Sequence, residues 1–174
     1  MTINKYEMIK VIKPSTSVLD DDGVFIKVVK KIFANFGETN IKYFTSTQQF
    51  LLDYKQDQDV RLIVLDYILG DERGIDILKL INTHDDRYVN VVVISNQEGY
   101  SDSEARDLII ELFHNGLYRY INKSDENWAI KLENYYRDAY KDILEYETKK
   151  VEKENELLAK QDLIEALKEA QKIK

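Results

Sequence analysis

The sequence predicts an α/β fold, a doubly wound sheet of five parallel strands in the order 2-1-3-4-5, followed by one long, extended C-terminal helix. Short β-branched runs alternate with amphipathic segments through the first two thirds of the chain. Such alternation favours a parallel sheet with right-handed crossovers and with helices on both faces. The last glycine is Gly116 and the only proline is Pro14, so the remaining third lacks the residues that usually end a helix.

Five segments have the composition and length of strands. Residues 62–65 and 91–94 are apolar at every position, as expected for strands that helices cover on both faces. The predicted strands are residues 16–20, 41–44, 62–66, 90–95 and 118–122.

The segments between these strands have helical periodicity. Apolar residues recur at helical spacing from Val24 to Phe36, and Gly37 follows as a C-cap. Shorter helices are predicted over residues 47–54 and 74–82. Ser101 and Glu104 have the spacing of a capping box, which predicts that a fourth helix begins there.

The C-terminal segment predicts a single long helix. Residues 125–174 contain neither glycine nor proline, and Ser124 is placed to act as the N-cap. These 50 residues would form a helix of roughly 75 Å if it were continuous. The apolar residues thin out after Tyr146 and keep no single heptad register.

Two interpretations of this tail stay open: a solvated single helix, and a dimerising coiled coil or signalling linker. The second is favoured because an isolated, highly charged helix gains little stability without a partner. We therefore divide the chain into an N-terminal extension of residues 1–15, a domain of residues 16–146, and a helical linker or coiled-coil tail of residues 147–174.

The composition is that of a soluble protein with an acidic surface. The 174 residues carry a net charge of −7 and include no cysteine, which excludes disulfides and cysteine nucleophiles. This charge offers no basic face for direct contact with nucleic acid. Because there is no signal-peptide core and no apolar run of membrane-spanning length, we expect a cytoplasmic protein without a membrane segment.

Polar residues gather where the predicted strands end. Asp20 and Asp21 close the first strand, Asp66 closes the third, Ser95 closes the fourth, and Lys123 directly follows the fifth. Ligands of open parallel sheets bind beyond the carboxyl ends of the strands, where the strand order reverses. Each residue alone could be a turn or cap residue, but four such features on one edge favour a functional site.

The chemistry that suits these residues is phosphoryl transfer to a carboxylate. Clustered carboxylates repel one another unless a hard divalent cation is bound, and oxygen-rich sites of this kind suit Mg²⁺. Asp66 would be the nucleophile and would form an acyl phosphate. Lys123 would pair with one phosphoryl oxygen, and the hydroxyl of Ser95 would donate to another.

The residues in these positions resemble the receiver domains of two-component response regulators, over roughly residues 16–146. The resemblance implies a flavodoxin-like fold and a metal site on Asp20, Asp21, Asp66 and the backbone carbonyl of Ile68, with Asp21 the more direct ligand of the acid pair. It also implies a switch that couples Ser95 to Tyr120. The matching pieces are Val18-Leu19-Asp20-Asp21, Leu65-Asp66 followed by Gly74, Ile94-Ser95, and Tyr120-Ile121-Asn122-Lys123.

The function implied by this resemblance is that of a bacterial signalling switch. Asp66 would accept a phosphoryl group from a sensor histidine kinase or a phosphotransfer protein, with Mg²⁺ as cofactor. The phosphorylated form would remodel the face made by the fourth helix, the fifth strand and the fifth helix, and with it the C-terminal helix. This change would control homodimerisation or an output domain of a longer protein, of which this chain would be the N-terminal part. Only self-catalysed phosphorylation and dephosphorylation are implied, so the chain is not expected to be an enzyme.

Three positions depart from the family pattern. Gly70 and Ser124 stand where the family has prolines, and Asn96 stands where it has a small residue. The stretch from Ser95 to Lys123 is also several residues longer than usual, which indicates an extension around residues 96–103 or of the fourth helix. These changes leave the reactive residues in place but put the lifetime of the phosphorylated form in doubt.

The sequence counts against one alternative function and leaves a second one open. A phosphatase of the haloacid dehalogenase type needs a second acid two residues after its nucleophile, and that position is Ile68. A phosphate-independent pseudo-receiver, acting as a dimerisation or scaffold module, is the alternative that the sequence leaves open.

Overall fold

The structure is a computed structural model that describes residues 14–84, 87–96 and 100–172. Most of the predicted N-terminal extension, and the centre of the predicted insertion at residues 96–103, therefore lie outside the described residues. Five parallel strands form the main sheet in the order β2-β1-β3-β6-β7. In chain order this is 2-1-3-4-5, so the predicted flavodoxin-like sheet is confirmed. The strands are β1 (Ser15–Leu19), β2 (Ile41–Phe44), β3 (Val60–Asp66), β6 (Asn90–Ser95) and β7 (Arg119–Asn122).

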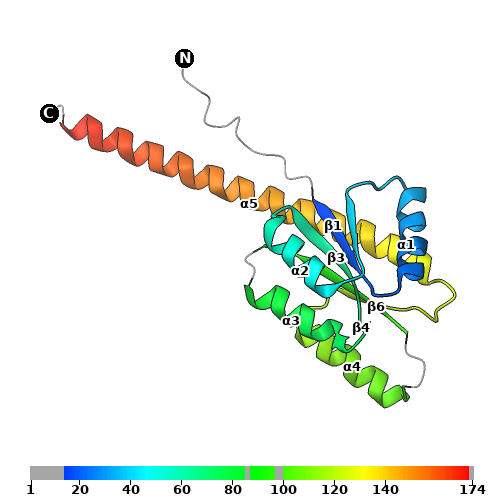
Figure 1. Ribbon diagram of the computed structural model, residues 1–174. Coiled ribbons are helices and arrows are strands. Elements are labelled where there is room, and N and C mark those ends of the chain that lie inside the picture. Colours follow the sequence, from blue (N-terminus) through cyan, green and yellow to red (C-terminus); the bar gives the residue numbers. More distant parts are fainter. Residues whose placement is uncertain (1–13, 85–86, 97–99, 173–174) are drawn as a thin grey trace. The chain divides into compact units, whose positions relative to one another are not determined.

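Five helices cover the two faces of the sheet (Figure 1). Side chains of α2, α3 and α4 pack on one face around Phe50, Leu78 and Leu112. Side chains of α1 and the first part of α5 pack on the other face around Phe33 and Leu132. Because both faces are covered, β3 and β6 are buried along their whole length, as their continuous apolar runs predict. The helices are α1 (Gly23–Asn35), α2 (Thr47–Gln56), α3 (Gly74–His84), α4 (Asp102–His114) and α5 (Trp128–Lys172).

The ends of α1 and α4 follow the signals in the sequence. Gly37 has a φ of 82° and its N–H donates to the carbonyl of Ala34, while Glu38 donates to Phe33. These two bonds form a Schellman motif, which needs a residue with positive φ just past the helix. At the start of α4, Ser101 and Glu104 form the predicted capping box. The sequence thus marks both helix ends through local backbone chemistry.

A small hairpin after β3 was not predicted. Its antiparallel strands β4 (Ile68–Leu69) and β5 (Glu72–Arg73) are joined by a two-residue turn at Gly70, where φ is 63°. This turn places the hairpin directly after Asp66, and α3 begins immediately beyond it at Gly74.

The long helix α5 begins three residues later than predicted. Asp125 accepts a hydrogen bond from the N–H of Asn127 at 2.8 Å, and its carbonyl accepts from Trp128 at 3.0 Å. These bonds close a turn, so the first helical residue is Trp128 rather than Asp125. The side chain of Lys131 also pairs with the Asp125 carboxylate, which holds this turn against the first turn of the helix.

The chain divides into two compact units, and the larger one ends at Ile143. Up to that residue α5 is part of the domain, and Leu132, Ala139 and Ile143 are fully buried. From Leu144 the helix belongs to the second unit, and most of its large apolar residues there are exposed, among them Leu157, Ile164 and Leu167. No helix among the described residues is long and apolar enough to cross a membrane.

Candidate functional site

Two aspartates meet at the carboxyl edge of the sheet, as the sequence predicts. Strands β1 and β3 are neighbours, and Leu19 pairs with Leu65, so Asp20 and Asp66 lie side by side. Both are buried, with 1% and 6% of their surface exposed. A buried carboxylate is costly unless a cation or several donors are close to it, so this pair requires compensating charge or hydrogen bonds.

Lys123 supplies the positive charge between the two aspartates. Its Nζ lies 2.7 Å from Oδ2 of Asp20 and 3.0 Å from Oδ2 of Asp66. The backbone N–H of Lys123 donates to the carbonyl of Ser95 at 2.8 Å, which fixes the residue to the end of β6. The residues predicted to cooperate from three different strand ends are therefore in direct contact.

Backbone donors orient the two carboxylates. Oδ1 of Asp20 accepts from the N–H of Asp22 at 2.9 Å, and Oδ1 of Asp66 accepts from the N–H of Tyr67 at 2.8 Å. Each aspartate therefore uses one oxygen for the chain and directs the other at Lys123. The exposed Asp21 completes the group, because oxygens of Asp20, Asp21 and Asp66 all lie within 4.8 Å of one another.

Burial raises the pKa of both buried aspartates, and a neighbouring carboxylate adds to the effect, Asp21 at Asp20 and Asp20 at Asp66. The pKa of Asp66 rises to about 6, because burial and the charge of Asp20 outweigh the opposing effect of Lys123. The pKa of Asp20 is also raised, chiefly by burial, although Lys123 and the N–H of Asp22 act against that. One lysine is thus too little positive charge for two buried carboxylates.

This shortage of positive charge fits a divalent cation. Three carboxylates with oxygens within 4.8 Å form a hard-oxygen donor set of the kind that Mg²⁺ prefers. The hairpin offers a further donor, because Ile68 and Arg73 form the pair of the antiparallel ladder that does not exchange hydrogen bonds. The carbonyl of Ile68 therefore points away from its partner strand, and the residues present fit a metal ion.

A glycine at the start of α3 lets the backbone after the hairpin close onto Asp66. A Cβ on Gly74 would lie 3.0 Å from Cα of Tyr67 and would overlap the carbonyl oxygen of Asp66. The N–H of Gly74 donates to the carbonyl of Tyr67 at 2.6 Å, which ties the start of α3 to the residue after Asp66. Only glycine allows this close approach.

Phe25 is a contact of the site that the sequence reasoning missed. The Nζ of Lys123 lies 4.2 Å from the centre of the Phe25 ring, a cation–π distance. The Phe25 ring in turn packs on Trp128 with 5.2 Å between ring centres. In the sequence Phe25 is one of several apolar residues of α1, and nothing in that pattern distinguishes a residue that faces Lys123 from one that faces the core.

Ser95 and Tyr120 lie on the same face of the sheet. Ser95 is buried, and its hydroxyl donates to the carbonyl of Asn96 at 3.3 Å. Tyr120 pairs with Val93, two residues before Ser95, and its half-buried ring packs on the core beneath α2, α3 and α4. Since residues two apart on a strand share a face, Ser95 and Tyr120 are diagonal neighbours on adjacent strands.

Comparison with known proteins identifies the family. A family model for the response regulator receiver domain matches residues 17–131. The chain belongs to the response regulator receiver domain family. A search of curated proteins gave no match.

Solved structures share the receiver fold at low sequence identity. The response regulator DrrB of Thermotoga maritima, described as an OmpR/PhoB homologue, is 24% identical with a TM-score of 0.53, over 68% of this chain and 48% of that one. A receiver domain protein from Clostridium thermocellum is 17% identical with a TM-score of 0.61, over 72% and 93% of the two chains. The receiver domain of NtrX from Brucella abortus is 20% identical with a TM-score of 0.60, over 72% and 97%. At these identities the likeness supports the fold alone.

Two of the three departures from the receiver pattern are bonded to each other. The hydroxyl of Ser124 donates to Oδ1 of Asn96 at 2.7 Å, which links the loops after β6 and β7. The N–H of Ser124 donates to Oδ1 of Asn122 at 2.9 Å, and no cis peptide bond occurs among the described residues. A side-chain bridge thus joins these loops where the family pattern has a small residue and a proline.

Proposed function

We propose that this receiver domain is a signalling switch that accepts a phosphoryl group on Asp66. The observation that carries the proposal is the triad of Asp20, Asp66 and Lys123, in which one cation lies within 3.0 Å of two buried carboxylates of raised pKa. Such a site is short of positive charge, and its acids lie at the edge of the sheet that parallel α/β proteins use for ligands.

The proposed reaction is the transfer of a phosphoryl group from a phosphohistidine to a carboxylate. An oxygen of Asp66 attacks phosphorus, the P–N bond to the imidazole breaks, and the imidazole leaves with the bonding electron pair and takes up a proton. The product is an acyl phosphate on Asp66. The hydrogen bond from the N–H of Tyr67 orients the carboxylate for this attack.

Charges and donors around Asp66 would hold the transferred group. Lys123 can move from the two carboxylates to a phosphoryl oxygen, since its flexible chain already reaches Asp66. The hydroxyl of Ser95 would exchange the carbonyl of Asn96 for a second phosphoryl oxygen. Asp20, Asp21, Asp66 and the carbonyl of Ile68 would hold Mg²⁺, which when bound supplies the positive charge that neutralises the transferred group.

The switch would run from Ser95 to Tyr120. If the Ser95 hydroxyl turns toward the phosphoryl group, it vacates space on the face of the sheet where Tyr120 is its diagonal neighbour. An inward move of Tyr120 would change the surface formed by α4, β7 and α5. This surface and the C-terminal helix would then control homodimerisation or an output domain.

The proposed partner is a sensor histidine kinase or a phosphotransfer protein. Two valines on one side of α1, Val24 and Val28, are 67% and 43% exposed, one helical turn apart. They lie on the helix that also carries Phe25, the contact of Lys123. An apolar surface beside the acceptor suits the docking of a partner helix that must bring its phosphohistidine to Asp66.

The domain division proposed is a receiver of residues 16–146, preceded by an N-terminal extension and followed by a helical tail of residues 147–174. The exposed leucines of the tail suit a coiled-coil partner, and a second copy of the chain is the partner proposed. We place the protein in the bacterial cytoplasm, where histidine kinases deliver their phosphoryl groups.

Intact-mass analysis after treatment with acetyl phosphate and Mg²⁺ tests the proposal. The wild-type chain should gain one phosphoryl group, and the Asp66→Asn variant should gain none. Asp107→Asn, which changes an exposed aspartate of α4, is the matched control and should behave as wild type. If no phosphorylated wild-type species forms with acetyl phosphate, phosphoramidate or carbamoyl phosphate, the proposed switch is wrong.

A further inference from the structure

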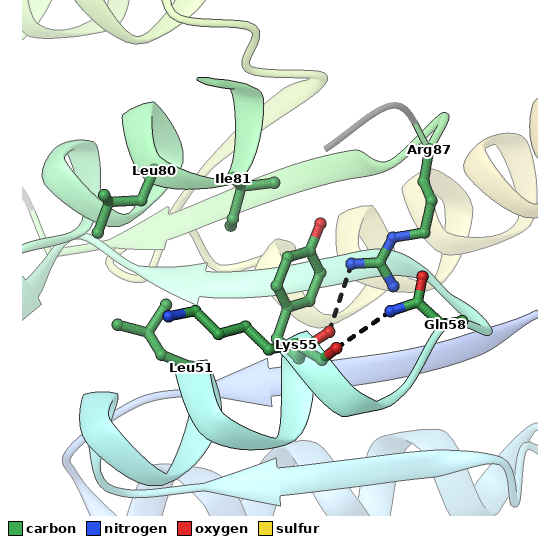
Figure 2. Close-up of a pocket in the computed structure, with 7 residues that line it drawn as sticks. Leu51, Lys55, Gln58, Leu80, Ile81 and Arg87 are labelled. Carbon is green, nitrogen blue, oxygen red and sulfur yellow. Dashed lines mark hydrogen bonds between the residues drawn. The ribbon is translucent and has the colours of Figure 1, made fainter. Parts of the chain in front are cut away.

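A cavity of about 440 Å³ lies between α2 and α3, and the proposed switch does not use it (Figure 2). Apolar side chains from both helices form much of its wall, while three polar side chains stand at its ends. It is lined by Leu51, Tyr54, Lys55, Gln58, Leu80, Ile81 and Arg87. Its volume falls within the range of roughly 300–1,000 Å³ that small-molecule sites occupy.

The cavity lies at the edge of the sheet opposite the phosphoryl site. Gln58 precedes the start of β3 and Arg87 precedes the start of β6. Asp66 and Ser95 are the last residues of the same two strands. Because the strands are parallel, an occupant of the cavity would not compete with a phosphoryl group on Asp66.

Arg87 forms a fixed positive end of the cavity. Its guanidinium carbon lies 4.3 Å from the centre of the Tyr54 ring, which is a stacking contact. Its Nη1 donates to the carbonyl of Asp57 at 2.6 Å, and its Nη2 donates to the carbonyl of Tyr54 at 3.3 Å. These contacts hold the cation at the end of α2 and keep the Tyr54 ring against the wall of the cavity.

Lys55 supplies a second, exposed cation. It follows Leu51 by one helical turn, and Figure 2 shows its side chain extending along α2 toward Leu51. The acids nearest to it on α2 and just beyond, Asp53 and Asp57, both bind Lys42, with distances of 2.8 and 2.9 Å. Among the residues that the structure describes, Lys55 has no ion-pair partner, so its charge is available to a ligand.

We propose that this cavity binds a small amphipathic monoanion, with an apolar body between the two helices and a carboxylate at Lys55. The chemistry follows from the lining: Leu51, Leu80 and Ile81 offer an apolar slot that a phenyl ring or branched chain fits. The two cationic side chains exclude a positively charged head group and favour an anionic one.

Nuclear magnetic resonance titration of the full chain with 4-phenylbutyrate tests this site. Backbone amide signals of the cavity residues should shift in a saturable way, while those around Asp66 stay unchanged. Two analogues isolate the charge: 4-phenylbutan-1-ol should bind about tenfold more weakly, and 4-phenylbutylamine more weakly still. Equal binding of the acid and the alcohol would overturn the anionic preference, and the absence of saturable shifts would overturn the site.

Two variants tie the binding to the cavity. Leu80→Trp should fill the slot and abolish the shifts, because Leu80 is 44% exposed and a larger side chain can be accommodated there. Lys55→Glu should weaken 4-phenylbutyrate but not the alcohol, while the control Lys27→Glu, on the exposed side of α1, should change neither. Unchanged circular dichroism of each variant shows that it is folded.

The phosphoryl site and the cavity can be tested separately. Asp66→Asn should bind 4-phenylbutyrate as the wild type does, so a failure of the proposed phosphorylation leaves this inference intact. If Leu80→Trp binds the acid with unchanged affinity, the ligand is held elsewhere and the proposal is wrong.

Discussion

The two edges of the sheet hold the same ratio of charges in different surroundings. Near the amino edge, Lys42 binds Asp53 and Asp57, and its side chain is 43% exposed. At the carboxyl edge, Lys123 binds Asp20 and Asp66, and both acids are buried. In each case one lysine pairs with two carboxylates, so the two edges differ mainly in how far the ion pairs are exposed to solvent.

Exposure to solvent decides whether the pKa of these acids is lowered or raised. Burial raises the pKa of Asp57, but the hydrogen bonds and charge of Lys42 outweigh it and hold that pKa below its usual value. At Asp66, burial and the charge of Asp20 prevail and the pKa rises to about 6. The same arrangement that satisfies the amino edge leaves the carboxyl edge in need of a second cation, which supports the phosphoryl site proposed there.

The largest expected effect is that of removing the Asp66 charge. Because its folded pKa of about 6 lies above the ordinary 3.8, Asp66 favours folding at low pH, and this contribution is lost as the pH rises from 4 to 6. In Mg²⁺-free buffer the loss should reach about 3 kcal/mol, and Asp66→Asn should remove it. Urea denaturation at pH 4, 5, 6 and 7 measures this difference.

Added Mg²⁺ should counteract the loss of stability that ionised Asp66 causes in the wild type. In the wild type, added Mg²⁺ should raise the free energy of unfolding at pH 7, by an amount that grows with its concentration. In Asp66→Asn that gain should shrink. If Asp66→Asn is no more stable than the wild type at pH 7 without Mg²⁺, then Lys123 already compensates the charges of both aspartates.

Gly74→Ala should distort the carboxyl edge of the sheet by displacing the backbone next to Asp66. The added Cβ would overlap the carbonyl of Asp66, and the hairpin would have to shift at a cost of about 2 kcal/mol. Phosphorylation by acetyl phosphate should slow as the Asp66 carboxylate is displaced. Gly23→Ala is the matched control, since a Cβ there meets nothing within 4 Å, and its stability should stay within about 0.5 kcal/mol of wild type.

Ser124→Ala tests the side-chain bridge between the loops after β6 and β7. The variant loses the 2.7 Å bond to Asn96, which should cost roughly 1 kcal/mol or less because the bond is exposed. The lifetime of phosphorylated Asp66 should change, since Lys123 directly precedes Ser124. Mass spectra over a time course after removal of the phosphodonor give this lifetime, and an unchanged value would exclude the bridge from its control.

Lys42→Met should have the smallest effect. The cation is partly exposed, so its loss should cost less than about 1 kcal/mol at pH 7. Asp57 has a lowered pKa in the folded protein, so it stabilises folding above its ordinary pKa and loses this contribution as the pH falls. Denaturation curves of wild type and variant should therefore converge toward pH 3, and a gap that widens there would contradict the assignment.

Most of the fold could be predicted from the sequence, because local sequence patterns mark most of the strands and helices. Continuous apolar runs mark β3 and β6, and glycines with positive φ mark the ends of α1 and α4. The hairpin after Asp66 was not predicted because strands of two residues are too short to show the alternation of apolar and polar residues that marks a strand. The start of α5 was misplaced because Asp125 suits both a first helical turn and the preceding turn that it in fact closes.

The site was predictable where strand topology alone decides position. Asp20, Asp66, Ser95 and Lys123 end or follow strands, so the sheet order brings them together. The role of Phe25 was not predictable, because its contact with Lys123 depends on the rotation of α1 over the sheet. Periodicity shows that a helix has an apolar face but not which residue of that face meets a given cation.

The row of contacts from Asp66 to Lys123, Phe25 and Trp128 gives the domain a built-in optical probe. Trp128 is the only tryptophan of the chain, so its emission comes from one known place. The centre of its ring lies 5.2 Å from that of Phe25, and the Nζ of Lys123 lies 4.2 Å from the centre of the same Phe25 ring. Any event that draws Lys123 toward a new anion changes the electric field at the indole, and so the colour and intensity of its fluorescence. The occupancy of the acceptor could thus be followed in real time in the unlabelled protein.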